Sequence, residues 1–557
     1  MDTTGSGFLE PAFLLSLGPN QFPRQIERLL WHLGFTDVAN IDGSGDGGGD
    51  LLGRRRGQAW VLQCKWKKRG IVNAAAVDEV ARARDQYRAD KAAVVTNMRF
   101  SVDATKRTDQ LALLAPKINL WSGSTLERVF AQVDEKFTEV VLRTYQEEAR
   151  NAINRRLERT GRALLVLATG LGKTVVSGEV INDHLERFPC DQVLVVAHTK
   201  DLVDQLERAL WRHLPKMVKT RLLTGEERPD DLDGVTCATL ASAYYAVQRG
   251  YRPSLVVIDE AHHVGEDGQY SELLNALADS RQLGVTATPW RGDEYNIAHR
   301  FGEPVFKLGI EDGMRNGYLA QVDYRLFVDN IDWEVVRDAS KNSYSLAELN
   351  SKLFLPERDE AIRDELAAVW GNIVEPRALI FCRTVEHAER IADLLKRNPR
   401  WSDAQAVHAK LPKRERQSRL LAFRSGAIPI LTAVDILNEG VDVPDVNILC
   451  FARVTHSRRV FVQQLGRGLR LREGKERVIA LDFVSDLRRI AAALNIKREL
   501  EVDEVETLQG VASSSIEFSD QRVGSLMNEW IKDAANLETA YDEARLQFPD
   551  PSATRGW

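Results

Sequence analysis

The stretch Leu164–Thr174 reads Leu-Leu-Val-Leu-Ala-Thr-Gly-Leu-Gly-Lys-Thr, an apolar run that leads directly into a loop with two glycines. Glycines let backbone N–H groups approach an anion, and a helix that starts after the loop adds its positive dipole end. Lys173 is therefore placed to contact the β- and γ-phosphates of a nucleotide, and Thr174 to bind the accompanying Mg²⁺. The other loop residues in this prediction are Thr169, Gly170 and Gly172. Because Leu167 replaces the first glycine of the strict pattern, an ordinary strand-to-helix turn stays open on this stretch alone.

Short apolar runs alternate with amphipathic segments from about residue 136 to residue 490. This alternation predicts parallel strands joined by helical crossovers, and its two successive sets predict two α/β domains, over residues 136–320 and 321–490. The expected strands are Leu164–Leu167, Val193–Ala197, Leu255–Ile258 and Leu283–Thr286 in the first domain, and Ala378–Phe381, Ile428–Leu431, Ile448–Phe451 and Val478–Leu481 in the second.

The pattern of apolar residues over 19–135 predicts a separate α/β domain with the order helix, strand, strand, helix, strand. The spacing of isoleucine and leucine between residues 26 and 33 predicts the first helix. The basic turn Arg54–Gly57 is expected to join the two strands as a hairpin. Residues 1–18 are expected to form a lead before this domain, and residues 491–557 an acidic helical segment.

The composition is that of an ordinary globular protein, with 44% hydrophobic residues, 28% charged residues and a net charge of -6. Binding to nucleic acid would therefore depend on local basic patches rather than on the charge of the whole chain. The five cysteines are scattered, which argues against a zinc site or a disulfide framework and favours the reducing cytoplasm. No membrane partner is expected, because no apolar run approaches the ~18 residues that a span needs.

The tetrapeptide Asp259-Glu260-Ala261-His262 directly follows an expected strand. The carboxyl ends of parallel strands face the ligand in α/β proteins, so both carboxylates would lie next to the nucleotide. Asp259 is expected to hold Mg²⁺, and Glu260 to polarise the attacking water. An acidic loop without a catalytic role is the alternative, and the phosphate loop earlier in the chain argues against it.

The segment Gln463–Arg470 carries two arginines, Arg467 and Arg470, that helical spacing places on one face. Arginines supplied by a second domain stabilise the charge that spreads over a phosphoryl group in the transition state. A solvated basic helix is the alternative for this segment.

These motifs, in this order, resemble those of a superfamily-2 helicase of the DEAH-box type, close to the motor subunits of type I and type III restriction enzymes. The resemblance covers about residues 140–490 and implies two RecA-like domains that close on ATP and move stepwise along nucleic acid. It implies that Gln146 reads the adenine and that Gly440, Asp442 and Gln463 help to bind the nucleotide. It also implies contacts to the nucleic-acid backbone from four threonines, Thr199, Thr239, Thr384 and Thr432.

Asp50, Gln63 and Lys65 form a second candidate site, in the N-terminal domain. Residues two apart in a strand point to the same face, so Gln63 and Lys65 project together while Cys64 points the other way. Asp50, on the adjoining strand of the hairpin, can meet them. The carboxylate and the amide oxygen would hold a divalent cation at a scissile phosphate, and Lys65 would orient water or stabilise the developing charge.

This constellation resembles that of the Mrr-type restriction endonucleases, a branch of the PD-(D/E)XK nucleases in which glutamine stands where most relatives have glutamate. The resemblance spans about residues 20–130 and implies a site for Mg²⁺, or for Mn²⁺, to which Glu27 of the first helix also contributes. Taken alone, Glu27 also fits a solvated surface charge, and Asp46 fits a turn residue better than a ligand. The basic run Lys65–Arg69 is expected to contact the DNA backbone rather than to form a solvated edge.

The two resemblances imply a cytoplasmic enzyme that couples ATP-driven translocation on DNA, or unwinding of DNA, to endonuclease cleavage in restriction or anti-phage defence. Target recognition would come from a protein partner or from the state of the DNA, because no recognition segment is evident. One alternative is a helicase-nuclease of DNA repair or recombination, which would prefer forks or ends. Another is a remodelling helicase, acting on RNA, whose catalytically silent N-terminal domain only binds nucleic acid.

Overall fold

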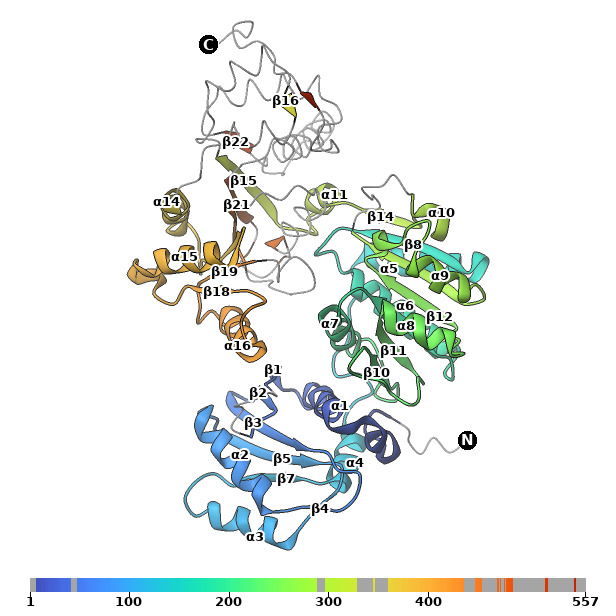
Figure 1. Ribbon diagram of the computed structural model, residues 1–557, viewed down its shortest axis with the longest axis vertical. Coiled ribbons are helices and arrows are strands. Elements are labelled where there is room, and N and C mark those ends of the chain that lie inside the picture. The colour runs from blue at the N-terminus through green and yellow to red at the C-terminus, as the bar shows by residue number, and fades with distance from the viewer. Residues whose placement is uncertain are drawn as a thin grey trace, which may run out of the picture. The chain divides into compact units, whose positions relative to one another are not determined.

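The structure is a computed structural model that describes residues 7–41, 48–287, 296–327, 359–434, 446–452 and 477–483, with a few short pieces at 344–345, 468–469, 471, 475, 516–518 and 545–546 (Figure 1). The chain divides into two compact units. The first holds the N-terminal domain together with most of the first parallel-sheet domain, and the second holds the other parallel-sheet domain. The expected α/β class, with a sheet at the centre of each of three domains, is confirmed.

The N-terminal domain is built on a five-stranded sheet whose pairing is antiparallel on one side and parallel on the other. Its strands, in spatial order, are β1 (Thr36–Asn40), β2 (Leu51–Arg55), β3 (Gln58–Lys65), β5 (Lys91–Thr96) and β7 (Asn119–Trp121). One face packs against α1 (Pro11–His32) and α4 (Gly123–Gln132), and the other against α2 (Ala74–Gln86) and α3 (Val102–Leu111). The short strands β4 (Ile71–Val72) and β6 (Arg99–Phe100) pair with each other. Arg56 and Gly57 take positive φ angles between β2 and β3, so the predicted hairpin is confirmed.

The first helix begins earlier than the sequence suggested. Phe8, Phe13 and Leu14 are buried in the core of the N-terminal domain, and α1 starts at Pro11. Gly18, with a φ of 76°, interrupts the helix and lets its two halves run in different directions. The expectation that residues 1–18 form a lead is therefore wrong for residues 7–18. Burial of each large apolar side chain stabilises the fold by about 1.5–3 kcal/mol, which holds this segment in the domain.

Seven strands form the sheet of the first parallel-sheet domain. In spatial order they are β10 (Thr220–Leu223), β11 (Val235–Thr239), β9 (Val193–Ala197), β12 (Leu255–Asp259), β13 (Arg281–Thr286), β8 (Arg162–Leu167) and β14 (Phe306–Leu308). The helices of this domain are α5 (Thr144–Thr160), α6 (Lys173–Arg187), α7 (Lys200–Leu210), α8 (Leu240–Gln248), α9 (Gln269–Ala276) and α10 (Ala298–Phe301). The four predicted strands correspond to β8, β9, β12 and β13. Their side chains are buried on both faces, which is why they read as continuous apolar runs.

The second parallel-sheet domain also has a seven-stranded sheet. In spatial order its strands are β18 (Gln405–Val407), β19 (Ile430–Ala433), β17 (Ala378–Cys382), β20 (Ile448–Ala452), β21 (Arg477–Phe483), β15 (Gln321–Phe327) and β22 (Ile516–Phe518). Its described helices are α11 (Ile310–Arg315), α14 (Asp359–Trp370), α15 (Val385–Lys396) and α16 (Lys413–Arg424). The predicted strand Ile428–Leu431 is shifted by two residues in β19, and the other three are found.

The sheet of the second parallel-sheet domain extends beyond residue 490, because β22 pairs with β15. The expected domain boundary at that residue is therefore too early. Within residues 491–557 the structure describes only β22 and the short strand β23 (Arg545–Leu546), which pairs with β16 (Tyr344–Ser345). The remainder of the expected helical segment lies outside the described residues. No helix among the described residues is both long and apolar enough to cross a bilayer.

Candidate functional site

The phosphate loop lies between β8 and α6, and α6 begins at Lys173. Gly170 and Gly172 have φ angles of 93° and 87°, in the left-handed region that glycine adopts without strain. A Cβ atom added to Gly172 would lie 2.5 Å from Nε2 of Gln146, so the loop also requires glycine for space. Gln146 is mostly buried on α5, and its amide oxygen accepts a hydrogen bond from the backbone N–H of Arg143 at 3.0 Å. The expected adenine-reading residue is thus held against the loop.

The two expected catalytic carboxylates lie at the end of β12. Asp259 is the last residue of that strand, and Glu260 follows with a φ of 49°. Nζ of Lys173 lies 3.5 Å from Oε1 of Glu260, and both side chains are close to 12% exposed. The lysine of the phosphate loop and the carboxylates of the neighbouring strand therefore form one site.

The two carboxyl groups differ in acidity. Burial and the neighbouring charge of Glu260 raise the pKa of Asp259 above its usual range. Burial alone would also raise the pKa of Glu260, but Lys173 and His262 reverse this effect and hold that pKa below its usual range. Glu260 is therefore ionised at neutral pH, as a group that polarises water must be.

His262 is a site residue that the sequence reasoning left without a role. Its buried ring nitrogen Nδ1 lies 3.2 Å from Oε2 of Glu260 and 3.0 Å from Oγ1 of Thr286, at the end of β13. The histidine thus joins the carboxylate of Glu260 to the next strand of the sheet. Its place in the Asp-Glu-Ala-His tetrapeptide was the available signal.

The loop also contains a polar group without a partner. The hydroxyl of Thr169 is buried and makes no hydrogen bond among the described residues. A buried hydroxyl of this kind needs an acceptor, and a phosphate oxygen is one. Together with Lys173, Asp259 and Thr174 on the first turn of α6, this arrangement fits a nucleotide with its Mg²⁺.

The four threonines expected to contact nucleic acid occur at or after strand ends, with different surroundings. Thr199 and Thr384 are exposed. Thr199 caps α7 by accepting a hydrogen bond from the backbone N–H of Leu202, and Thr384 caps α15 by accepting one from that of His387. Thr239 ends β11, and its hydroxyl donates to Ser242 at 3.0 Å.

Thr432 differs from the other three threonines. Its side chain is buried in the core, and its hydroxyl donates to the carbonyl oxygen of Ala388 at 2.8 Å. The expectation that this hydroxyl contacts nucleic acid is therefore wrong, because it is committed to the packing of β19 against α15.

Five expected nucleotide-site residues of the second parallel-sheet domain lie outside the described residues and stay predictions: Gly440, Asp442, Gln463, Arg467 and Arg470.

The second candidate site lies where β2, β3 and α2 meet. Gln63 and Lys65 both contact the carboxylate of Glu79 on α2, through the amide nitrogen of Gln63 and at 2.6 Å from Nζ of Lys65. The two side chains therefore share a face, while Cys64 between them packs on the α1 side. Asp50 accepts a hydrogen bond from the backbone N–H of Cys64, so its carboxylate lies beside the part of β3 that carries Gln63 and Lys65. The sequence reasoning missed Glu79, which lies on a helix after the hairpin without a local motif.

The donor set of this site fits a divalent cation. The amide oxygen of Gln63 is buried and accepts no hydrogen bond among the described residues, although its amide nitrogen is bonded to Glu79. Lys65 and Gln63 outweigh the effect of burial and hold the pKa of Glu79 below its usual range. The Asp50 carboxylate, the unused amide oxygen of Gln63 and the ionised Glu79 are oxygen ligands of the kind that Mg²⁺ prefers. No cluster of three or more His, Cys, Asp or Glu side chains at metal-binding spacing occurs in the described part of the chain.

Glu27 does not take the place that the resemblance implied for it. It is 2% exposed on α1, and its Oε1 accepts a hydrogen bond from Nε of Arg208 at 2.7 Å. Arg208 belongs to α7 of the first parallel-sheet domain. The prediction that Glu27 serves the nuclease site is therefore corrected: its carboxylate is used at the contact between the two domains, and Glu79 supplies the carboxylate beside Gln63 instead.

Three family models match the chain. Residues 14–130 match "Restriction endonuclease", in its Mrr catalytic form, residues 139–291 match "Type III restriction enzyme, res subunit", and residues 339–472 match "Helicase conserved C-terminal domain". The chain thus combines an Mrr-type restriction endonuclease domain with a superfamily-2 helicase motor of the restriction-enzyme kind.

The similar proteins include both helicases and restriction enzymes. "Putative mitochondrial ATP-dependent helicase irc3" of Schizosaccharomyces pombe is 29% identical over 74% of this chain and 66% of its own length. "Type I restriction enzyme EcoAI endonuclease subunit" of Escherichia coli is 25% identical over 67% of this chain and 50% of its own length. The solved structure "ATP-dependent Type ISP restriction-modification enzyme LlaBIII bound to DNA" matches with a TM-score of 0.49 at 16% identity, over 95% of this chain and 42% of that one. The chain spans two thirds or less of the length of each of these relatives.

Proposed function

We propose that this chain is an ATP-driven DNA translocase or helicase whose N-terminal domain cleaves DNA with the help of a divalent cation, in restriction or defence. The observation that carries the proposal is the ion pair between Lys173 and Glu260, which joins the phosphate loop to the strand-end carboxylates. The nuclease part is supported by the contacts that gather Asp50, Gln63 and Lys65 around β3.

In the motor, Lys173 would exchange its contact with Glu260 for the β- and γ-phosphates of ATP. Glu260 would then be free to orient the attacking water, and its lowered pKa keeps it ionised for this role. Thr174 and Asp259 would hold Mg²⁺, which supplies positive charge at the phosphates. Arg467 and Arg470 are proposed to stabilise the transition state.

In the N-terminal domain, Asp50 and the amide oxygen of Gln63 would hold a divalent cation, which supplies Lewis acidity at the scissile phosphate. Lys65 would keep its ammonium group beside this position through its pairing with Glu79. The exposed side chains of Arg54, Arg56, Lys68 and Arg69 lie on the flanking turns and would contact the DNA backbone without reading its sequence.

The two activities can be separated by one experiment. Wild type, Lys173→Ala and Asp50→Ala would be assayed for phosphate release and strand cleavage on duplex, forked and single-stranded DNA, with and without ATP. Lys173→Ala is expected to abolish ATP turnover, and Asp50→Ala to abolish cleavage while ATP turnover persists. Turnover that survives Lys173→Ala would overturn the motor assignment, and cleavage in EDTA would overturn the metal requirement. Cleavage confined to forks or ends would favour repair over restriction, and the absence of cleavage in wild type would favour a binding module.

A further inference from the structure

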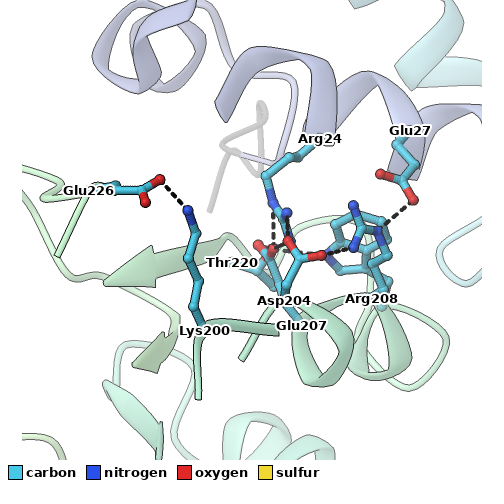
Figure 2. A network of polar contacts seen from close by, with 9 residues as sticks. Arg24, Glu27, Lys200, Asp204, Glu207, Arg208, Thr220 and Glu226 are labelled. Carbon is cyan, nitrogen blue, oxygen red and sulfur yellow. Dashed lines mark hydrogen bonds and ion pairs between the residues drawn. The ribbon is translucent and has the colours of Figure 1, made fainter. Parts of the chain in front are cut away.

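A group of buried and partly buried charged side chains lies between the N-terminal domain and the first parallel-sheet domain, where α1 packs against α7 (Figure 2). Three guanidinium groups and three carboxylates meet there: Arg24, Arg28 and Arg208, with Glu27, Asp204 and Glu207.

The ion pairs cross the interface in both directions. Arg24 of the N-terminal domain pairs with Asp204 and Glu207 of the motor, and its Nε donates to Oε2 of Glu207 at 2.9 Å. In the opposite direction, Arg208 of the motor donates to Glu27 at 2.7 Å and also pairs with Asp204 on its own helix (Figure 2). The second carboxylate oxygen of Glu207 accepts a hydrogen bond from the hydroxyl of Thr220 at 2.7 Å. Asp204 and Glu207, the two carboxylates of α7 at this contact, therefore both pair with Arg24 across the interface.

Four of the six charged groups are withdrawn from water, whereas the side chains of Asp204 and Arg208 are 31% and 28% exposed. Arg24, Glu27 and Glu207 are 5%, 2% and 1% exposed. Although burial alone would raise it, Arg24 and Arg208 lower the pKa of Asp204 to about 2, so this group stays ionised at neutral pH. A charge buried to this extent and left without its partner is strongly unfavourable, so the two domains separate only at a high cost in free energy.

Backbone and ring contacts surround the ion pairs. Arg28, which is fully buried, donates to the carbonyl oxygens of Val218 at 2.8 Å and Pro215 at 3.0 Å in the motor. The guanidinium of Arg221 lies 4.5 Å from the ring centroid of Phe13. Both halves of α1 therefore contact the motor domain.

The helix that receives these contacts also begins at a proposed nucleic-acid contact. Thr199, exposed and at the N-cap of α7, directly precedes the turns that carry Asp204, Glu207 and Arg208. The opposite side of α7 is packed on the sheet through buried Leu202, Val203 and Leu206. One short helix thus connects a proposed nucleic-acid contact to the N-terminal domain.

We propose that α1 and α7 form a rigid coupling interface, which fixes the nuclease domain to the first motor domain and holds its site at a constant position relative to the strand that Thr199 contacts. The nuclease then travels with this motor domain, and ATP-driven movement brings DNA to the nuclease site in a fixed geometry. The functional half of this inference rests on the proposed function, whereas the rigidity of the interface does not.

The test uses the full chain with Arg24→Met, which keeps the length of the side chain and removes its charge. Amide hydrogen exchange in the peptide covering residues 21–32 is expected to accelerate on the order of a hundredfold, because Glu207 loses its partner. ATP-dependent cleavage of long duplex DNA is expected to fall by about tenfold or more, since even a 1 Å displacement of catalytic groups is costly, with ATP turnover and ATP-independent cleavage nearly unchanged. The matched control is Arg187→Met, which breaks the exposed pair with Glu158 inside the motor domain and should change neither exchange nor cleavage.

A second variant, Glu207→Gln, keeps the size of the side chain and guards against a folding defect of Arg24→Met. Like Arg24→Met, it should accelerate amide hydrogen exchange in the peptide covering residues 21–32. Unchanged exchange in both variants would overturn the rigid interface. Accelerated exchange with unchanged ATP-dependent cleavage would overturn its functional role alone. If wild type neither hydrolyses ATP nor cuts DNA, the proposed function fails, and the exchange measurement still decides whether the interface is rigid.

Discussion

Nζ of Lys173 lies 3.5 Å from Oε1 of Glu260, so the group proposed to bind phosphate and the group proposed to activate water neutralise each other. On the proposed function, nucleotide binding would draw Nζ of Lys173 from this carboxylate toward the β- and γ-phosphates. Glu260 keeps His262 as a partner when this happens. Binding of ATP would thus itself release the carboxylate for the role proposed for it.

Glu260→Gln should remove hydrolysis while nucleotide binding persists. Loss of a group that orients and deprotonates water typically lowers the rate on the order of 10²–10⁴-fold, and the neutral amide leaves Lys173 free for phosphate. Phosphate release and the affinity for a fluorescent ATP analogue would be measured side by side. Glu266→Gln, an exposed residue just after the tetrapeptide, is the control and should behave as wild type. Normal turnover in Glu260→Gln would remove this residue from the mechanism.

Gly172→Ala should impair nucleotide binding more than backbone strain alone explains. The added Cβ would lie 2.5 Å from Nε2 of Gln146 and would displace the side chain that is expected to read the adenine. Gly250→Ala is the matched control, because Gly250 has a φ of +99° but no atom within 4 Å of an added Cβ. Both variants incur a strain of about 1 kcal/mol, but only Gly172→Ala should raise the KM for ATP by about tenfold or more. Equal effects in the two variants would contradict the role of Gln146.

Gln63→Glu should lower the metal concentration that cleavage requires. The new carboxylate adds a charge at the buried oxygen that now has no partner, and half-saturation by Mg²⁺ should fall by about tenfold or more. In EDTA the same variant should unfold at a lower temperature, because the new charge faces Glu79 without a cation between them. Thermal midpoints with and without Mg²⁺ would test both effects, with Gln58→Glu at the exposed start of β3 as a charge control. An unchanged metal requirement would argue against Gln63 as a ligand.

Acidification should destabilise the interface between the two domains through His32. Burial, with the charges of Arg28 and Lys216, lowers the pKa of this histidine to about 4, although a contact with the backbone of Asp134 acts in the opposite direction. Since an unfolded histidine titrates near pH 6.5, the unfolded chain binds the proton first, and stability is lost as the pH falls from about 6.5 to about 4. His32→Gln should flatten this dependence. Thermal midpoints measured between pH 7 and pH 4 would show it, and an identical slope in both proteins would contradict the assignment.

Local patterns predicted the sites whose residues are close in the sequence. These predictions are the strand that leads to Lys173, the strand that ends at Asp259, and the shared face of Gln63 and Lys65. Each follows from residues that are near neighbours in the sequence. The rules for such patterns follow from backbone geometry, so the sequence alone carried them.

The features that the sequence did not reveal depend on packing between distant elements. Glu79 reaches Gln63 only because α2 lies across β3, and no spacing within the helix indicates this. Glu27 looks like a surface charge or a metal ligand until α7 supplies Arg208. Thr432 matches a family motif, yet its hydroxyl is turned into the core. Each error arose where a partner more than a dozen residues away determined the environment of the side chain.

From the sequence alone, the nuclease and the motor look like independent domains that could be exchanged separately. The buried charges between α1 and α7 mean that they are not. A nuclease domain transferred to another motor would leave Arg24 and Glu27 without counter-ions. The motor that had lost its nuclease domain would expose Glu207. A working chimaera would have to carry α7 and the following strand β10 along with the nuclease, so that the unit exchanged spans both domains.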